Sequence, residues 1–527
     1  MKKEEKKGEK RGRMGVEKAE EGRESGTGER TGANGSEKEL GSIVLRHFSV
    51  LQRRKCVSFA WFSRLIVGKK EIKVYLCADL TKIPHKMRHT AHLKKALMGI
   101  ALLCMATGVQ AHRTTNWGRM DRSKLNIGTY YLQPYAQTEA HVRDLKACGI
   151  DFIIGMQNDK KILDILQKYE VGAVVSGVLP GWWGGDGANA GQLKDQNPLS
   201  KYEEAAKTFT DHPAVWGIDI GDEPSALDFP YYGKVYEKVS ELFPNQFPYL
   251  NLYPNYASVS QNDAEQTVNQ LGTPTYEEHI AEYCKNLPAD YLCYDFYLYS
   301  INVPRAYENL RVVADACTGS GRSMWIVLQV NSDKEKEWIT ENGLRFQAYT
   351  AMAYGAEVIT WACYTAGWWY NQVLDEKGNK TQQYEKLKRV NKEIHLLAEP
   401  YMKYRRTDTQ LIGFQHSGWN ENVRQQNLTE LNNKVFTKVH MEDCSPLVVG
   451  EMISRAGDGG EALFVCSADD PYDKSRRSHK LRFRAEGRKI TVTGTKGEIP
   501  VKEDEDGFYS INLPSNQAAL IEAHYKY

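Results

Sequence analysis

The stretch "AVWGIDIGDEP" (residues 214–224) decides the fold, because an apolar β-type run passes directly into acidic residues. Its first part is nearly continuous in apolar residues, which is typical of a strand covered on both faces in a parallel sheet. Pro224 ends the run, since proline cannot donate to a neighbouring strand. Asp219, Asp222 and Glu223 lie in the run or at its end. Protein interiors solvate charge poorly, so acids in this place indicate a chemical role.

Runs of this kind recur between Lys124 and Arg405, and amphipathic stretches of helical spacing separate them. In order, the eight runs are residues 124–132, 150–157, 171–180, 214–224, 248–254, 290–299, 324–330 and 356–364. Buried strands that alternate with helices predict a parallel sheet covered by helices. Eight repeats match a closed (β/α)₈ barrel, for which roughly 250 residues are typical. An open doubly wound sheet is the alternative, but no Gly-rich phosphate loop follows the first run.

The texture changes from about Arg406, where short alternating runs are separated by Gly, Asp and Asn turns. This pattern predicts an antiparallel β-sandwich. We therefore assign residues 112–405 to a catalytic α/β barrel (a TIM barrel) and residues 406–527 to a small all-β accessory domain.

The N-terminal part has two sections of different composition. Residues 1–42 are almost entirely Lys, Glu, Arg, Gly and Ser, and such a composition cannot bury a core. Residues 87–111 combine basic residues, a short apolar segment and the small-residue end Val109-Gln110-Ala111, as a secretory signal peptide does. We expect translation from Met87, export, and a mature chain without residues 1–86. A cytoplasmic tail before an uncleaved anchor is the alternative, although the apolar segment is short for a span.

Composition excludes several classes of partner and cofactor. A formal net charge of +2 with 26% charged residues gives no pull toward nucleic acid or an anionic membrane. The 10 cysteines include no CxxC pair, and the histidines are scattered, so we expect no metal site and no cofactor. We expect no stable membrane insertion after signal cleavage.

The ends of the strands are the candidate active site, because barrel enzymes carry their chemistry at this end. Glu223 directly precedes Pro224, and a carboxyl group among aromatic residues has a raised pKa that suits a general acid. We expect Asp222 to orient a substrate group. The alternative is that both acids cap the following helix. Asp295, in "CYDFYLY", is a further catalytic candidate, or an acid satisfied by barrel hydroxyls.

The seventh run, "MWIVLQVNS", is where a second carboxylate is expected, and it presents Gln329 instead. Paired tryptophans in Gly-containing loops suit stacking against sugar rings, whereas single tryptophans are usually core. Neutral amides and phenols at strand ends suit recognition of hydroxyl groups. The predicted substrate-binding residues are Trp182, Trp183, Asn251, Tyr253, Tyr297, Gln329, Trp361, Trp368 and Trp369.

These residues together resemble the retaining glycoside hydrolases with (β/α)₈ barrels, the clan that includes β-galactosidases. The fourth strand of that clan ends in Asn-Glu with Glu as acid/base, and Asp222-Glu223 stands in this place. The segment "LRFQAYTAMAYGAEVITWACY" (344–364) is similar to the passage into the clan's eighth strand, and "GFYSINLPSNQAALIEAHY" is similar to the closing strands of its all-β domains. Gln329 departs from the clan, because it stands at the position of the nucleophilic Glu.

An Asp-Glu pair on strand four also resembles the β-N-acetylhexosaminidases, and Tyr294, Asp295 and Trp361 are similar to residues of chitinase-type barrels. These enzymes use the acetamido oxygen of the substrate as nucleophile, with Asp as orienter and Glu as acid/base. The resemblance implies an exported glycoside hydrolase that acts on an oligo- or polysaccharide with Glu223 as acid/base. Two routes are then open: a substrate-assisted one in which Asp222 orients the acetamido group, and one in which Asp295 is the second carboxylate. A non-catalytic glycan-binding barrel is the remaining alternative.

Overall fold

The computed structural model describes residues 51–53, 56–67, 70–79, 117–183, 189–257, 270–414, 427–472 and 477–525. The chain divides into two compact units, Met1–Leu103 and Cys104–Tyr527. The first unit contains an antiparallel sheet of β1 (Leu51–Arg53), β2 (Cys56–Val67) and β3 (Lys70–Asp79). The expected signal peptide, residues 87–111, lies outside the described residues. Export, and the absence of residues 1–86 from the mature chain, stay predictions.

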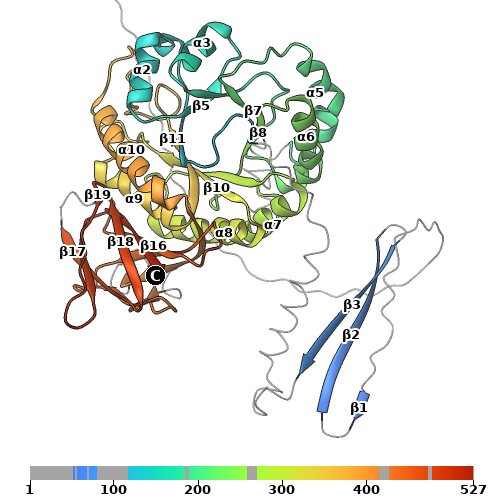
Figure 1. Cartoon of the computed structure of the whole chain (residues 1–527). Coiled ribbons are helices and arrows are strands. Elements are labelled where there is room, and N and C mark those ends of the chain that lie inside the picture. Colours follow the sequence, from blue (N-terminus) through green and yellow to red (C-terminus); the bar gives the residue numbers. More distant parts are fainter. Residues whose placement is uncertain are drawn as a thin grey trace, which may run out of the picture. The chain divides into compact units, whose positions relative to one another are not determined.

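The second unit opens with an eight-stranded parallel barrel, and this confirms the predicted fold (Figure 1). The strands follow the order β8-β7-β6-β5-β4-β11-β10-β9. A parallel bridge between Leu252 and Tyr294, with a 2.9 Å bond from the Leu252 N–H to the Cys293 carbonyl, joins the two ends of the sheet. The strands are β4 (Asn126–Tyr130), β5 (Phe152–Met156), β6 (Gly172–Val175), β7 (Val215–Asp222), β8 (Phe247–Asn251), β9 (Tyr291–Phe296), β10 (Ser323–Gln329) and β11 (Ala356–Ala362).

Helices surround this ring of strands, as Figure 1 shows. Side-chain caps begin several of them; Thr275 and Glu278 form a reciprocal capping box at α7, which satisfies two backbone N–H groups. The helices are η3 (Pro134–Ala136), α2 (Glu139–Ala147), α3 (Lys160–Lys168), α4 (Leu193–Gln196), α5 (Leu199–Ala206), η4 (Ala226–Asp228), α6 (Phe229–Leu242), α7 (Tyr276–Asn286), α8 (Val303–Ser320), α9 (Glu341–Ala353) and α10 (Gln382–Tyr401).

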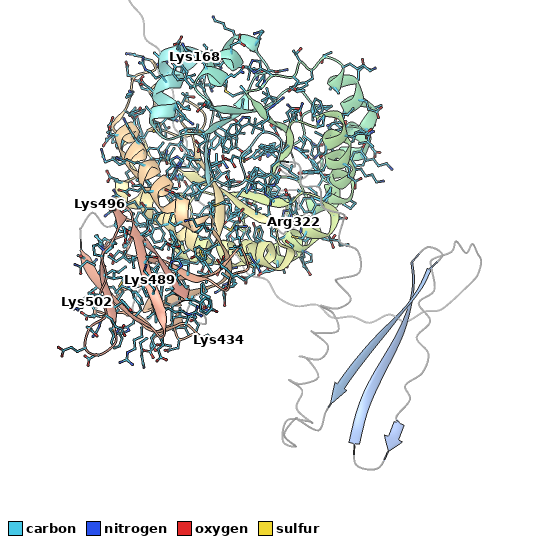
Figure 2. All side chains as sticks on the ribbon, viewed as in Figure 1. Lys168, Arg322, Lys434, Lys489, Lys496 and Lys502 are labelled. Carbon is cyan, nitrogen blue, oxygen red and sulfur yellow. The ribbon has the colours of Figure 1, made fainter. Side chains whose placement is uncertain are left out.

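Aromatic side chains fill the amino-terminal end of the barrel. Trp325 of β10 stacks on Tyr291 with ring centroids 4.1 Å apart, and it meets the edges of Trp117 and Phe247. Next to it, the buried Arg322 donates to the carbonyls of α7 and of the segment that follows it, tying this helix to the start of β10 (Figure 2). Because side chains fill the amino-terminal end of the barrel, we look for the active site at the opposite end, where the strands have their carboxyl ends.

The C-terminal part forms two sheets that are antiparallel except where the short β13 pairs with β12 in parallel, as the sequence predicts for a β-sandwich. One sheet has the order β13-β12-β15-β16-β21-β18-β19 and the other β14-β17-β20, with a shared apolar core. The strands are β12 (Tyr404–Ile412), β13 (Asn427–Leu428), β14 (Phe436–Met441), β15 (Leu447–Ser454), β16 (Glu461–Ser467), β17 (Ser478–Ala485), β18 (Arg488–Gly494), β19 (Gly497–Glu498), β20 (Tyr509–Pro514) and β21 (Ala518–Tyr525).

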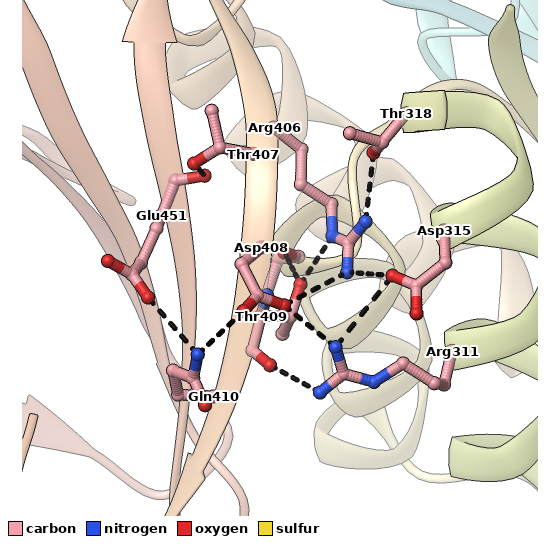
Figure 3. Close-up of polar contacts among 10 residues, drawn as sticks. Arg311, Asp315, Thr318, Arg406, Thr407, Asp408, Thr409, Gln410 and Glu451 are labelled. Carbon is pink, nitrogen blue, oxygen red and sulfur yellow. Dashed lines mark hydrogen bonds and ion pairs between the residues drawn. The ribbon is translucent and has the colours of Figure 1, made fainter. Parts of the chain in front are cut away.

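A polar cluster joins the sandwich to the barrel between β12 and α8 (Figure 3). The Arg406 guanidinium, whose side chain is 3% exposed, pairs with Asp315 at 2.8 Å and donates to Thr318 at 2.9 Å. In the opposite direction, Arg311 of α8 donates to Asp408 at 2.7 Å and to the Thr409 carbonyl at 2.6 Å. Each element therefore inserts a cation among acceptors of the other, which fixes the orientation of the two domains.

Candidate active site

A β-bulge in β7 brings two acids of the opening stretch to the same side of the sheet. Asp219 pairs with Tyr249 and Asp222 pairs with Asn251, with the register shift between Asp219 and Gly221. Residues three apart on a regular strand point to opposite faces, so the inserted residue returns Asp222 to the barrel interior. Gly221 is required in this place, because a Cβ there would lie 2.1 Å from the Tyr232 hydroxyl.

Glu223 leaves the strand in a left-handed conformation, with φ of 43°. Its backbone N–H donates to the Asn251 carbonyl at 2.9 Å, so the neighbouring strand fixes the residue. The Trp183 indole N–H donates to its carboxyl group at 3.3 Å. A left-handed non-glycine residue held in this way is typical of functional sites, where the surrounding contacts compensate for the strain.

Asn251 joins two acids from different strands. Its Nδ2 donates to Asp222 Oδ1 at 3.2 Å and to Asp295 Oδ1 at 2.8 Å, which places these two oxygens within about 6 Å of each other. The Glu223 carboxyl group lies close enough to Asp295 and Asp222 for their charges to act on it. The structure therefore brings together all three of the acids that the sequence singles out.

The cluster has unusual electrostatics, because four carboxyl groups crowd the carboxyl end of the barrel. Burial and the neighbouring charges of Asp295 and Asp222 raise the pKa of Glu223 well above its usual range. Burial, with the charge of Asp222, raises the pKa of Asp295 to about 7. Asp219, which accepts a 2.8 Å bond from Ser176, has its pKa raised to about 7, again mainly by burial.

The pKa of Asp222 is raised less than those of Asp219 and Asp295. Burial raises this pKa to about 6, and the hydrogen bonds from Asn251 and from the Glu223 N–H oppose the rise. Glu223, by contrast, has its pKa raised well above the usual range, and a carboxyl group that keeps its proton to higher pH suits a general acid.

Exposure to solvent separates the roles that the acids can take. Asp222 is an exposed residue and Glu223 is half-buried, so both can reach a bound molecule even though protein surrounds them on most sides. Asp295 is only 2% exposed and lies beneath them. A group that attacks or orients a substrate must touch it, which Asp222 can do more readily than Asp295.

Aromatic rings line the site next to the acids. Trp368 lies within 6 Å of Tyr130, Tyr131 and Tyr297 between ring centroids, and the Tyr297 and Trp369 centroids are 4.9 Å apart. The charge of Asp295 acts on Tyr297, which places this ring beside the carboxyl cluster. The loops after β4, β9 and β11 thus contribute one aromatic wall. Tyr297, Trp368 and Trp369 are residues that the sequence selects for substrate binding.

The first tryptophan pair divides into two roles. Trp183 is 57% exposed and touches Glu223, as a ring that contacts a ligand would. Trp182 is half-buried against the barrel core, and its carbonyl accepts from the Asp222 N–H at 3.2 Å. Trp182 therefore positions the backbone of the site.

Three of the residues that the sequence selects for substrate binding contact other parts of the barrel. Trp361 is fully buried and faces outward, where its indole donates to Asn391 of α10 at 2.9 Å. Tyr253 is 2% exposed, and its ring faces His279 of α7. The Gln329 side chain is also fully buried: its Oε1 accepts from the Tyr299 N–H at 2.8 Å and its Nε2 donates to Ser300 at 3.2 Å. Trp361 and Tyr253 thus contact the surrounding helices, whereas Gln329 has the inward parity of Trp325 on β10 and holds the loop that follows β9.

Sequence reasoning missed several residues of the site. The hydroxyl groups of Tyr130 and Tyr249 form a 2.8 Å hydrogen bond inside the barrel, below the acids. Tyr256 lies close enough to Asp295 and Glu223 for their charges to raise its pKa. The inward parity of Tyr130 and Tyr249 on their strands was the available signal. Tyr256 follows a strand end without any pattern that marks it.

None of the helices in the described part of the chain has the length and apolarity needed to cross a bilayer. Among the described residues, no group of three or more His, Cys, Asp or Glu has the arrangement of a metal site.

No family model matches the sequence, and no curated protein does. Solved structures with a similar arrangement include a family 30 subfamily 8 glycoside hydrolase, the xylanase Xyn30A from Clostridium acetobutylicum, at 10% identity and a TM-score of 0.37, covering 76% of this chain and 96% of that chain. A glucosidase from Croceicoccus marinus is similar at 9% identity and a TM-score of 0.37, with 80% and 98% covered. Xylanase 10B from Thermotoga petrophila is similar at 12% identity and a TM-score of 0.35, with 54% and 98% covered. These values are too low to transfer an activity, and the barrel is established by its own strand order and register.

Proposed function

We propose that this protein is a glycoside hydrolase in which Glu223 is the general acid/base. The observation that carries the proposal is the hydrogen-bonded set of Glu223, Asp295, Asn251 and Asp222 beside exposed and half-buried aromatic rings. A proton donor near neutral pH, next to faces on which a pyranose ring can stack, is what cleavage of a glycosidic bond requires.

We assign a substrate-assisted route on a sugar with a 2-acetamido group. Glu223 gives its proton to the glycosidic oxygen as the bond to the anomeric carbon breaks. The acetamido oxygen forms the new bond to that carbon, while Asp222 accepts the acetamido N–H and stabilises the positive charge. Glu223, now a carboxylate, then takes a proton from water, and this water opens the cyclic intermediate and releases the sugar with retained configuration.

Asp295 as a direct nucleophile is the second candidate, because it is a second carboxyl group close enough to Glu223 for its charge to raise the Glu223 pKa, and a retaining enzyme of the two-carboxylate kind uses such a pair. Its burial favours another role. Asp295 is 2% exposed and its charge raises the Glu223 pKa, so it acts on the reaction through Glu223.

Three single variants test the assignment on a panel of aryl β-glycosides and oligosaccharides built from N-acetylglucosamine, glucose, galactose, xylose and mannose. Glu223→Gln removes the proton donor and should lower kcat/KM by about 10²–10⁴-fold, the usual contribution of acid–base catalysis. Asp222→Asn should lower kcat strongly on N-acetylated substrates.

Asp295→Asn should retain measurable turnover and move the alkaline limb of the pH profile to lower pH, because the charge that raises the Glu223 pKa is gone. A collapse of turnover in Asp295→Asn with an inert Asp222→Asn would overturn the substrate-assisted route. If the unmodified protein cleaves no member of the panel while Glu223→Gln binds oligosaccharides, the chain is a glycan-binding barrel and not a hydrolase.

A further inference from the structure

Tyr472 of the sandwich presents its ring to solvent, unlike nearly all large aromatic residues of the described chain. The residue is 52% exposed and belongs to the loop that follows β16. Its neighbours in this loop, Asp469 and Pro471, are buried. A single exposed aromatic residue is common on a protein surface, so the feature that points to a ligand is the set of contacts that hold the Tyr472 ring beside the barrel loop of Tyr299.

Several contacts fix this ring in place. The Tyr472 N–H donates to Asp470 Oδ1 at 2.9 Å. The Tyr299 hydroxyl donates to the Pro471 carbonyl at 3.3 Å, and the Tyr299 ring meets the edge of Tyr472 with centroids 5.1 Å apart. Asp469, at the start of the loop, accepts from His479 at 2.8 Å. The ring is therefore held before any ligand arrives, which lowers the entropy cost of binding.

The barrel loop behind Tyr472 is the one that carries the aromatic wall. Gln329 holds this loop through the Tyr299 N–H and Ser300, and Tyr297 of the same loop packs against Trp369. The charge of Asp333, in the loop after β10, also reaches Tyr472. Tyr472 thus lies at the carboxyl end of the barrel, on the side of the aromatic wall that faces the sandwich.

We propose that Tyr472 forms an outer subsite for a glycan, so that the sandwich contributes to substrate binding and the substrate is an oligo- or polysaccharide chain rather than a single sugar. This inference rests on the proposed function. The exposed ring supplies a face for a pyranose, and the exposed Asp470 with the half-buried Asp333 supplies acceptors for its hydroxyl groups. Tyr297 and Trp369 continue the aromatic surface toward Glu223.

The test uses two substrates made of the sugar that the protein cleaves fastest in the panel above. One is the aryl glycoside of the monosaccharide, and the other is the corresponding hexasaccharide. Tyr472→Ala should lower the ratio of kcat/KM for the hexasaccharide to kcat/KM for the aryl glycoside by about 3- to 10-fold, as expected for loss of one stacking contact. The loss should appear in KM rather than in kcat. Tyr472→Phe keeps the ring and should restore the ratio.

Tyr525→Ala is the matched control, since Tyr525 is 49% exposed and lies at the opposite end of β21 from the Tyr472 loop. Its ratio should equal that of the unmodified protein. An unchanged ratio in Tyr472→Ala, or an equal loss on both substrates, overturns the subsite while hydrolysis itself stands. Calorimetric titration of the hexasaccharide into Glu223→Gln and into Glu223→Gln/Tyr472→Ala tests the subsite without catalysis, and equal affinities there also overturn it. Failure of hydrolysis in the unmodified protein instead contradicts the proposed function.

Discussion

Carboxyl groups that share a small volume depend on one another for their protonation. Glu223, Asp222 and Asp295 are all hydrogen-bonded to Asn251 and lie within reach of one another's charge, so a change at one acid alters the pKa of the others. The raised pKa values also bear on folding, because a buried acid that prefers its neutral form opposes the native state once it must ionise.

The residue-scale prediction follows from Asp295, whose pKa rises from 3.8 to about 7 on folding. Between these values the folded state binds more protons than the unfolded state, so the stability from this group is complete below pH 4 and is lost as pH rises through 7. Asp295→Asn should reduce the fall in unfolding free energy between pH 5 and pH 8 by roughly 2–3 kcal/mol. Urea unfolding at both pH values measures it, and an identical fall in both proteins would contradict the assigned pKa shift.

At the scale of the element, the end of β10 shows how a strand can lose the usual chemistry of its position. The Gln329 side-chain amide accepts a hydrogen bond from the Tyr299 N–H and donates one to the Ser300 hydroxyl. Its backbone N–H and carbonyl are both hydrogen-bonded to the side-chain amide of Gln347 in α9. The side chain therefore holds the loop after β9 that carries Tyr297.

Gln329→Glu is the corresponding prediction. A carboxylate at this fully buried place would be desolvated and would lose the donor to Ser300, so we expect a loss of about 1–3 kcal/mol in unfolding free energy and no gain in activity. Gln347→Glu is a matched change on the facing helix and should be similarly destabilising. Faster hydrolysis by Gln329→Glu would show that a carboxylate at position 329 can act on the substrate, and it would contradict the purely structural role assigned to the Gln329 amide.

At the scale of the whole molecule, the barrel and the sandwich act as one unit. Ion pairs between α8 and β12, shown in Figure 3, join the buried Arg406 to the exposed Asp315 and the half-buried Arg311 to Asp408, and they fix the two domains against each other. The contact between Tyr299 and the Tyr472 loop joins them a second time, next to the site. An accessory domain fixed at two places can support a catalytic loop and not only the core.

Arg406→Ala tests this coupling. It removes a buried guanidinium that bonds Asp315, Thr318 and Thr409, and we expect a loss of about 1.5–3 kcal/mol in unfolding free energy. Unfolding by guanidinium chloride, followed by tryptophan fluorescence and by far-UV circular dichroism, measures it. Arg405→Ala is the control, because Arg405 is exposed on the other face of the same strand and should change stability little. Equal stability of the two variants would show that the cluster does not join the domains.

The sequence by itself determined the barrel, the sandwich and the candidate acids. Apolar runs of strand length that alternate with amphipathic helices are a local pattern, and the carboxyl ends of parallel strands must share one end of the barrel. Asp222, Glu223 and Asp295 could therefore be assigned to one place from their positions at strand ends alone.

Only the tertiary structure decided which side chains meet there. The bulge at Gly221 turns the Asp222 side chain to the opposite face of β7, and no periodicity in the sequence indicates this bulge. Trp361 sits at a strand end like Tyr297, yet it faces α10, because one residue of register sends a side chain to the opposite face. The link between Asp222 and Asp295 through Asn251, and the position of Tyr472 beside Tyr299, join residues far apart in the chain, and such contacts exist only once the barrel has closed and the sandwich has docked.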